Sequence, residues 1–270
     1  MREITVAVVQ MSPRLGEPQE NIRRMSDTIR RICGEQPTDL IIFPELVTTG
    51  YELGVGFTDL AERVPGPTIN LLAKDAAEMQ THVVFGMPIK EKVESVLYDA
   101  AVCLGPDGEV LGDYRKVHLH GEERLAFRAG FRFPIMEADF GLLGILIGWD
   151  LAFPEAARSL ALDGAEIIAV CAAWEQSQMG EWRTYTLARA AENAVFLAAA
   201  NRVGQEPTLT FLGESMVLGP RGDVATAMDG TGEGYAIARL DLDRVRQARE
   251  ESQVFQCREP LAYRSLVRRY

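Results

Sequence analysis

The chain has 270 residues, and its 39 acidic against 28 basic side chains give a formal charge of −11. This charge argues against binding to duplex nucleic acid, which needs a basic surface to displace counterions. No run approaches the ~18 apolar residues of a membrane span, and the first ten residues are too polar for a signal peptide, so we expect no membrane contact. Four scattered cysteines without a C-x-x-C spacing favour reduced thiols in a cytoplasmic protein over disulfides or a zinc site.

The first ninety residues alternate predicted strands with predicted helices. Runs rich in β-branched residues predict strands at 4–10, 40–43 and 83–86. Apolar residues recur at helical spacing in 21–33, which Gly34 should end, and a second helix is predicted at 69–79. This β-α-β-α-β order indicates a layered α/β fold.

Two hairpins follow in the rest of the chain. The sequences PDG at 106–108 and PRGD at 220–223 are typical of tight turns between strands. The two hairpins are predicted at 95–104 with 109–116 and at 215–218 with 224–227. Further strands are predicted at 195–200 and 235–240, and further helices at 181–193 and 243–250. Because no linker or repeat divides the chain, we expect one domain over 1–270, with a mixed sheet or two sheets covered by helices.

The stretch 140–174, between these hairpins, is expected to organise the fold. It contains a strand at 142–147, a break at 148–150, a helix at 155–162 and a second strand at 167–171. Two buried strands joined by a helix form a parallel βαβ unit. Ligands of such sheets bind at the carboxyl ends of the strands, so 148–150 and 171–174 should border any site.

Two charged residues directly follow predicted strands. Glu45, in IIFPEL, would be poorly solvated unless paired, which suits a general base. Lys116, in DYRKVHL, would matter if it met Glu45, because an ammonium can then support a developing oxyanion. Glu123, seven residues on, could orient that lysine. For both Glu45 and Lys116 the alternative is an ordinary solvent-facing side chain.

Other residue patterns carry weaker signals. His118 and His120 with Glu122 would permit a metal ion, but the third histidine is distant, and we predict no metal. Serine-hydrolase and dinucleotide-binding motifs are absent, which argues against a nucleotide-dependent oxidoreductase, and no cofactor is predicted. Trp149 and Trp174, at neighbouring strand ends, would either line a pocket or belong to the core.

Several segments, in order, resemble the nitrilase, or carbon–nitrogen hydrolase, superfamily. The strongest are FPEL, YRKVHL and IGWDLAFPEAARSLALDGAEIIAVCAAW. Supporting segments extend the likeness over nearly the whole chain: AVVQMSPRLGEPQENI, GPTINLLAKDAAEMQTHVVFGMPIKE, RAAENAVFLAAANRVG and GESMVLGPRGDVATAM.

The resemblance implies an α-β-β-α sandwich that pairs into a homodimer. Independently of it, the basic tail at 252–270 is expected on a solvated surface or at an oligomer contact. It also implies cofactor-free hydrolysis of nonpeptide C–N bonds by a Glu-Lys-Cys triad, acting on a small amide, carbamoyl or nitrile substrate. Glu45 matches the general base, Lys116 the lysine that supports the oxyanion, and Glu123 the second glutamate near it. Tyr51, in TTGYEL, would border the pocket.

One position departs from the family pattern. The nucleophilic cysteine should directly precede the aromatic–Asp pair, and here Gly148 precedes Trp149 and Asp150. Glycine has no side chain and cannot attack a carbon, so covalent hydrolysis should be abolished. The backbone N–H of Trp149 and the Lys116 ammonium would still hold an acyl oxygen.

Several explanations of this glycine stay open. The cysteine was removed deliberately, or the protein is a natural relative that has become a silent binding or regulatory protein. Retention of Glu45, Lys116 and Glu123 favours recent or deliberate loss, because burying unused ions costs stability. Cys171, at the next strand end, is a less favoured replacement nucleophile than a buried structural thiol. The segment GWDLAFPEAAR resembles amidases and N-carbamoyl-amine hydrolases more than true nitrilases.

Overall fold

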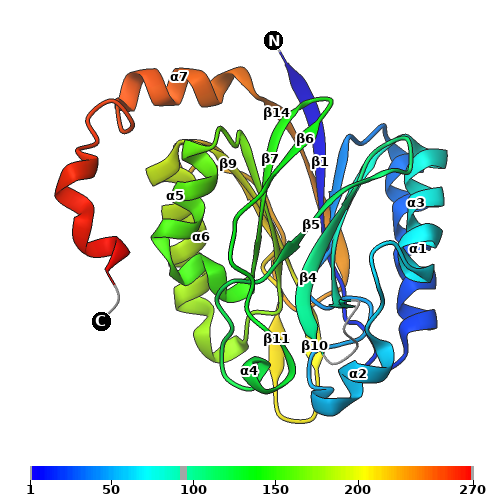
Figure 1. The fold of residues 1–270 in the computed structure, drawn as a ribbon. Coiled ribbons are helices and arrows are strands. Elements are labelled where there is room, and N and C mark those ends of the chain that lie inside the picture. Colours follow the sequence, from blue (N-terminus) through cyan, green and yellow to red (C-terminus); the bar gives the residue numbers. More distant parts are fainter. Residues whose placement is uncertain (1, 92–95, 269–270) are drawn as a thin grey trace.

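The computed structural model describes residues 2–91 and 96–268, in which two six-stranded mixed sheets face each other (Figure 1). The first sheet has the order β14 (Gly234–Asp241), β1 (Glu3–Gln10), β2 (Leu40–Ile42), β3 (His82–Lys90), β4 (Leu97–Leu104) and β5 (Val110–Arg115). The second has the order β13 (Val224–Ala227), β12 (Met216–Leu218), β9 (Phe196–Asn201), β8 (Ile167–Ala172), β7 (Gly141–Ile147) and β6 (Ile135–Ala138). In each sheet the three central strands are parallel and the outer ones antiparallel.

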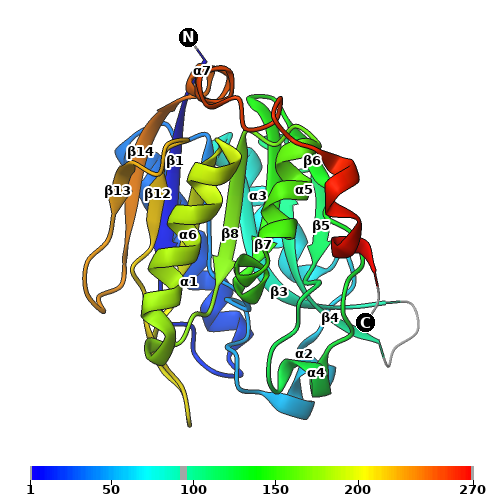
Figure 2. The ribbon, with the colours of Figure 1, turned by 90° about the vertical axis from the view of Figure 1, so that its left-hand side faces the viewer.

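Helices cover the outer face of each sheet, which gives the four layers α-β-β-α (Figures 1 and 2). The first sheet is covered by α1 (Pro18–Glu35) and α3 (Pro67–Met79), and the second by α5 (Pro154–Leu162) and α6 (Met179–Asn193). The short helices α2 (Phe57–Leu60) and α4 (Glu123–Ala126) and the hairpin of β10 (Val203–Gln205) and β11 (Thr210–Leu212) lie together at one end of the sandwich (Figure 1). The predicted α-β-β-α sandwich is confirmed.

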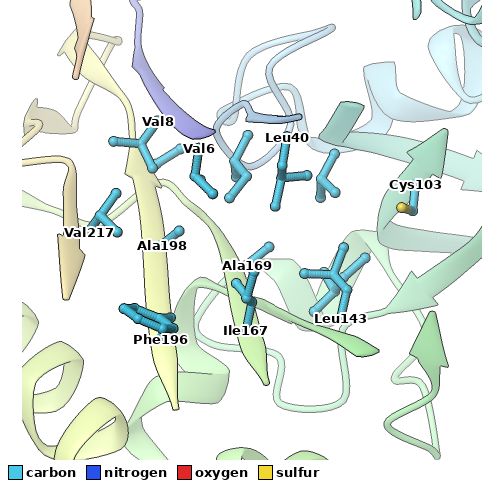
Figure 3. Packing of buried hydrophobic residues seen from close by; sticks show 14 of the residues in the cluster. Val6, Val8, Leu40, Cys103, Leu143, Ile167, Ala169, Phe196, Ala198 and Val217 are labelled. Atoms are coloured by element: carbon cyan, nitrogen blue, oxygen red, sulfur yellow. The ribbon is translucent and has the colours of Figure 1, made fainter. Parts of the chain in front are cut away.

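Alternation along each strand divides the core into layers. On β1, Val6 and Val8 face the second sheet, whereas Ala7 and Val9 pack under α1. Figure 3 shows Val6, Val8 and Leu40 of the first sheet opposite Ile167 and Leu143 of the second. Burial on both faces explains why the central strands are continuous apolar runs rather than alternating ones.

The helices bury one face each, as their spacing predicted. Ile22, Met25, Ile29 and Ile32 of α1 are all buried against the first sheet. However, α1 does not end at Gly34 and continues to Glu35, because that glycine stands in open space where nothing interrupts the helix.

Other boundaries differ from the predictions by a few residues, and some elements were not predicted. β6, β10, β11, α2 and α4 are too short for periodicity to reveal them. The predicted strand from residue 95 begins at Leu97, and residue 95 itself lies outside the described residues. No helix in the described part of the chain is both long and apolar enough to cross a bilayer.

After α7 (Asp243–Ser252) the chain forms an arm that lies outside α5 (Figure 1). A short 3₁₀ segment at Pro260–Val267 within this arm exposes the side chains of Leu261, Leu266 and Val267. The predicted polar, basic tail therefore also presents apolar groups.

The surroundings of Gly86 on β3 show how tightly the loop after β2 packs against that strand. A Cβ added there would lie 2.6 Å from both Glu45 Cα and Leu46 N, so the loop rests directly on β3. We expect Gly86→Ala to lower the free energy of unfolding by about 1–3 kcal/mol, measured by urea denaturation, because backbone must move. Gly34→Ala, in open space within α1, should instead raise stability by up to about 1 kcal/mol. Equal stability of the Gly86→Ala variant and the parent would show that the loop is not held there.

Candidate active site

Three buried carboxylates surround one buried ammonium at the end of the sandwich where α4 lies. Glu45 follows β2, Lys116 directly follows β5, and Glu123 is the first residue of α4. The fourth member, Asp99, lies on β4. At least 94% of each residue's surface is removed from solvent, since their exposures are 1%, 1%, 6% and 0% respectively.

Lys116 connects the two glutamates predicted to accompany it. Its Nζ donates to Glu45 Oε1 and to Glu123 Oε1, both at 2.6 Å, and lies 3.6 Å from Asp99 Oδ2. The backbone fixes the lysine as well, because its N–H donates to the Asp99 carbonyl at 2.9 Å. The predicted contact of Glu45, Lys116 and Glu123 is therefore present in the structure.

Glu45 and Glu123 have further donors. Ala173 N–H donates to Glu45 Oε2 at 2.8 Å, which ties the loop after β2 to the end of β8 across the two sheets. Glu123 Oε1 also accepts from the Tyr51 hydroxyl, and its Oε2 accepts from His120 N–H at 2.9 Å. Both carboxylates are thus held in one orientation.

The ammonium is stable in this site because of its neighbours. Burial alone would lower the pKa of Lys116, but the carboxylates of Glu123, Glu45 and Asp99 outweigh it and raise that pKa well above its ordinary value. Burial, assisted by Glu123, also raises the pKa of Tyr51 well above its ordinary value. Lys116 is therefore a permanent cation and Tyr51 a neutral hydrogen-bond donor.

The same carboxylates form a group of the kind that can bind a metal ion. One oxygen from each of Glu45, Asp99 and Glu123 lies within 4.8 Å of the others. Lys116 Nζ, however, donates to two of them and already supplies the positive charge between them. A cation at this position would have to displace a buried ammonium, which makes the lysine the natural counter-ion.

Gly148 begins a 3₁₀ turn at the end of β7, Gly148–Ala152, beside Glu45. Its φ is +41°, and a Cβ added there would lie 2.6 Å from Glu45 Oε2. A side chain at this position would therefore touch the carboxylate that Lys116 and Ala173 hold.

Asp150 anchors that turn. Its carboxylate accepts from the Tyr114 hydroxyl at 2.6 Å, from Ile147 N–H at 3.1 Å and from His118 N–H at 3.0 Å. His118 Nδ1 also lies 2.8 Å from it. Since Tyr114 belongs to β5 and Asp150 follows β7, this carboxylate links the two sheets next to Gly148.

The three histidines do not meet. His118 stacks on Phe153 beside Asp150, and His120 stacks on Trp149. His82 lies at the start of β3, where its ring contacts Asp39 and Asp139. They do not converge on a metal position among the residues that the structure describes.

A cavity of 270 Å³ borders the cluster at Glu123, whereas Glu45, Lys116 and Gly148 are not among its lining residues. Tyr51 and Glu123 line it, as do Phe57, Phe127 and His120. Trp174 lies elsewhere: it is 3% exposed, packs on Trp182 and donates its indole N–H to Gln178 O at 2.9 Å. Trp149, half-buried, stacks between His120 and Trp174.

Cys171 on β8 points into the core between the sheets rather than into this cavity. It is fully buried, and burial raises the pKa of its thiol well above its ordinary value. A thiol that stays protonated is a poor nucleophile. The structure gives Cys171 the features of a packing residue.

Residues that the sequence analysis did not single out complete the site. Asp99 could have been found, because it shares the inward face of its strand with Ala101 and Cys103. The Ala173 N–H and the Tyr114–Asp150 bond could not, because they depend on how the two sheets are paired.

Comparisons with known proteins agree with this architecture. The model of the carbon-nitrogen hydrolase family matches residues 5–250. A probable nitrilase of Schizosaccharomyces pombe is 40% identical over 266 residues, covering 97% of this chain and 98% of the relative. The crystal structure of a carbon-nitrogen hydrolase from Helicobacter pylori G27 has a TM-score of 0.89 at 26% identity and covers 99% of both chains.

A third relative is an amidase from Nesterenkonia sp. AN1, with a TM-score of 0.78 and 28% identity over 94% of this chain and 97% of that one. In that structure the acetamide moiety of fluoroacetamide is covalently added at the active-site cysteine. The fold, the family model and the relatives together show that this chain belongs to the carbon–nitrogen hydrolase family.

Removing the Lys116 ammonium should lower the free energy of unfolding, because the buried carboxylates would then repel one another. We expect Lys116→Met to lower the free energy of unfolding at pH 7 by about 3–5 kcal/mol, because it leaves buried acids without a counter-ion. Protonation relieves this repulsion, and the acids then hold protons in the folded state that they lose on unfolding above pH ~4. The deficit should therefore shrink as the pH falls towards 4, as followed by urea denaturation.

The matched control is Lys74→Met, because the Lys74 side chain is 75% exposed and lies 3.8 Å from Glu78. It should change the free energy of unfolding by less than about 0.5 kcal/mol at any pH. A similar effect of the two substitutions would contradict a central role of Lys116.

Proposed function

We propose that this site is built to hydrolyse the C–N bond of small amides or N-carbamoyl amines, with Glu45 as general base and Lys116 supporting the oxyanion. Glu123 and Tyr51 orient the lysine and the cavity wall. The observation that carries the proposal is that a side chain at Gly148 would meet Glu45 Oε2, whose carboxylate is bound to Lys116. Nucleophile position, base and cation therefore adjoin one another.

The chemistry requires a cysteine at position 148. Glu45 would accept the thiol proton while sulfur bonds to the acyl carbon and the carbonyl electron pair moves to oxygen. Lys116 and the Trp149 N–H would stabilise that oxygen, and the C–N bond would then break as Glu45 returns the proton to the leaving nitrogen. Water, deprotonated by Glu45, would cleave the thioester. With Gly148 no sulfur–carbon bond can form, so the chain would bind substrate without turnover.

The cavity supports a neutral or cationic substrate over an anionic one. Among the described residues that line it there is no lysine or arginine, but there are four glutamates: Glu52, Glu122, Glu123 and Glu175. A free carboxylate on the substrate would face these groups without a counter-ion, whereas an amine would be attracted. This favours amides and N-carbamoyl amines over amides of dicarboxylic acids.

The second candidate is a natural binding or regulatory protein that uses the same pocket silently. The φ of +41° at Gly148 favours it, because glycine adopts this conformation without strain and other residues rarely do. A nitrilase acting on nitriles is the remaining alternative, and the likeness to a probable nitrilase supports it.

Restoring the nucleophile tests the first candidate. We expect Gly148→Cys to release ammonia from short aliphatic amides or N-carbamoyl amines, measured by a coupled ammonia assay, and cationic substrates to react faster than carboxylate-bearing ones of equal length. Gly148→Ala is the matched control, because it adds the Cβ without the thiol. Adding Glu45→Gln to Gly148→Cys should lower kcat by at least about a hundredfold through loss of the base.

Turnover of nitriles alone by the Gly148→Cys variant would favour the nitrilase alternative. No turnover across amides, nitriles and carbamoyl compounds would favour the silent binding protein. In either case the parent chain should still bind the amide, because Lys116 remains in the site.

We also propose that the protein forms a homodimer through the arm at 252–270. The exposed fractions of Leu261, Leu266 and Val267 are 74%, 62% and 87%, which is unusual for three apolar side chains on one short segment. A second copy of the chain is the partner that the family resemblance implies.

We expect light scattering after gel filtration to give a dimer for the parent and a monomer for Leu266→Asp. Leu125→Asp serves as the control, since Leu125 is 88% exposed but lies on α4. A monomeric parent, or a dimer unaffected by Leu266→Asp, would contradict the assignment.

A further inference from the structure

Asp99 is a buried acid that the catalytic scheme above does not use. It lies on β4, where Ala101 and Cys103 share its face, so its side chain points between the two sheets. The antiparallel partner of Asp99 is Pro88, and its exposed fraction is 0%.

The Asp99 side chain accepts no hydrogen bond from the described residues. Neither carboxyl oxygen accepts from any N–H or hydroxyl in the part of the chain that the structure describes. Lys116 Nζ lies 3.6 Å from Asp99 Oδ2, which is too far for a hydrogen bond. The ammonium donates instead to Glu45 and Glu123, both at 2.6 Å. An ionised carboxylate in this position would be desolvated on both oxygens.

The neighbour that Asp99 does reach is Glu45. One oxygen of Asp99 lies within 4.8 Å of an oxygen of Glu45, and a hydrogen bond between the two carboxyl groups can form only if one of them carries a proton. Glu45 already accepts two hydrogen bonds, one from Lys116 Nζ and one from Ala173 N–H. Asp99 has no such donors, so the proton belongs on Asp99.

Charge counting leads to the same result. Three ionised acids with Lys116 would give three negative charges and one positive charge, a net charge of −2 among residues that are each at most 6% exposed. One proton on Asp99 reduces this to −1 and converts a repulsive contact into a hydrogen bond.

We propose that Asp99 is a positioning residue, a neutral carboxylic acid whose hydroxyl donates to Glu45 and leaves Glu45 as the ionised partner of Lys116. The Glu45 carboxylate then has three donors, from β4, from the end of β5 and from the end of β8. This fixes the carboxylate against the Cβ position of residue 148. The positioning role rests on the proposed function, whereas the charge state of Asp99 does not.

Several titratable groups act electrostatically on Asp99 or respond to its charge, and they come from both sheets: Glu45, Lys116, Glu123, Tyr114 and Cys171. Burial first, and then Glu45, raises the pKa of Asp99 well above its ordinary value, and Lys116 opposes this only in part. Among them only Lys116 is cationic, and two shorter ion pairs already engage it.

Infrared spectroscopy tests the charge state in the chain as it stands. At pH 7 the parent should show the carbonyl stretch of a protonated carboxylic acid, and Asp99→Asn should remove it. Asp75→Asn is the matched control, because Asp75 is 2% exposed but pairs with Arg30 at 2.8 Å, and it should leave the band unchanged. Identical spectra for the parent and Asp99→Asn would overturn the proposal.

The pH dependence of stability provides a second test. A proton kept by folded Asp99 is lost on unfolding above pH ~4, so the parent should become less stable with rising pH relative to Asp99→Asn. The unfolding constant of the parent should rise about tenfold per pH unit relative to that variant until folded Asp99 ionises. A flat or opposite difference would mean that Asp99 is ionised in the fold.

The positioning role is tested in the Gly148→Cys background. Asp99→Asn keeps a donor for Glu45 and should retain kcat within about threefold, whereas Asp99→Leu should lower it about ten- to a hundredfold with little change in KM. The ratio of kcat for the Gly148→Cys, Asp99→Asn double variant to kcat for Gly148→Cys alone should rise at alkaline pH, because only the enzyme that keeps Asp99 can lose a proton at residue 99. Equal kcat for the Asn and Leu variants would reject the positioning role, and an inactive Gly148→Cys enzyme would reject the proposed function while leaving the infrared result intact.

Discussion

The buried ammonium of Lys116 is the interaction on which the site depends. Removing a lysine and three acids from water costs several kcal/mol per ion, and only close pairing recovers that cost. Here Nζ lies 2.6 Å from oxygens of Glu45 and Glu123, which come from different parts of the chain. The loop after β2, the end of β5 and the start of α4 must therefore reach their places together, so the cluster fixes the geometry of this end of the sandwich.

Two further contacts join the sheets at the same end. Ala173 N–H reaches Glu45 from the end of β8, and Asp150 accepts from Tyr114 on the opposite sheet. Gly148 lies between these contacts. The N–H of Ile147, the preceding residue, donates to Asp150 Oδ2, so a hydrogen bond that does not involve a side chain at position 148 helps to set the backbone there. Such a scaffold orients a nucleophile before any substrate arrives.

Most central strands, the first helix and three residues of the site could be predicted from the sequence. Strands 4–10, 142–147 and 167–171 were found because burial on both faces makes them continuous apolar runs. Helix 21–33 was found because burial on one face gives its apolar residues a helical spacing. The meeting of Glu45, Lys116 and Glu123 followed from the resemblance, since nothing in local periodicity relates residues 45 and 116. Asp99 was missed although an acid on the inward face of a strand is a visible anomaly, and Trp174 was left between pocket and core because strand-end position does not decide which way a ring turns. The cross-sheet contacts of Glu45 and Asp150 depend on how two sheets are placed, and no short-range pattern encodes that.

The charge balance of the cluster bears on what the chain can do with glycine at position 148. Lys116 and the carboxylates of Glu45 and Glu123 pair with one another without any side chain at position 148. The formation of the cluster therefore does not depend on a side chain at position 148. A cysteine, in contrast, would bring its Cβ within 2.6 Å of Glu45 Oε2, so the carboxylate would have to shift against Lys116 and Ala173 to admit it. The packing that would bring a side chain at position 148 into contact with Glu45 also makes glycine the residue that requires no shift of that carboxylate.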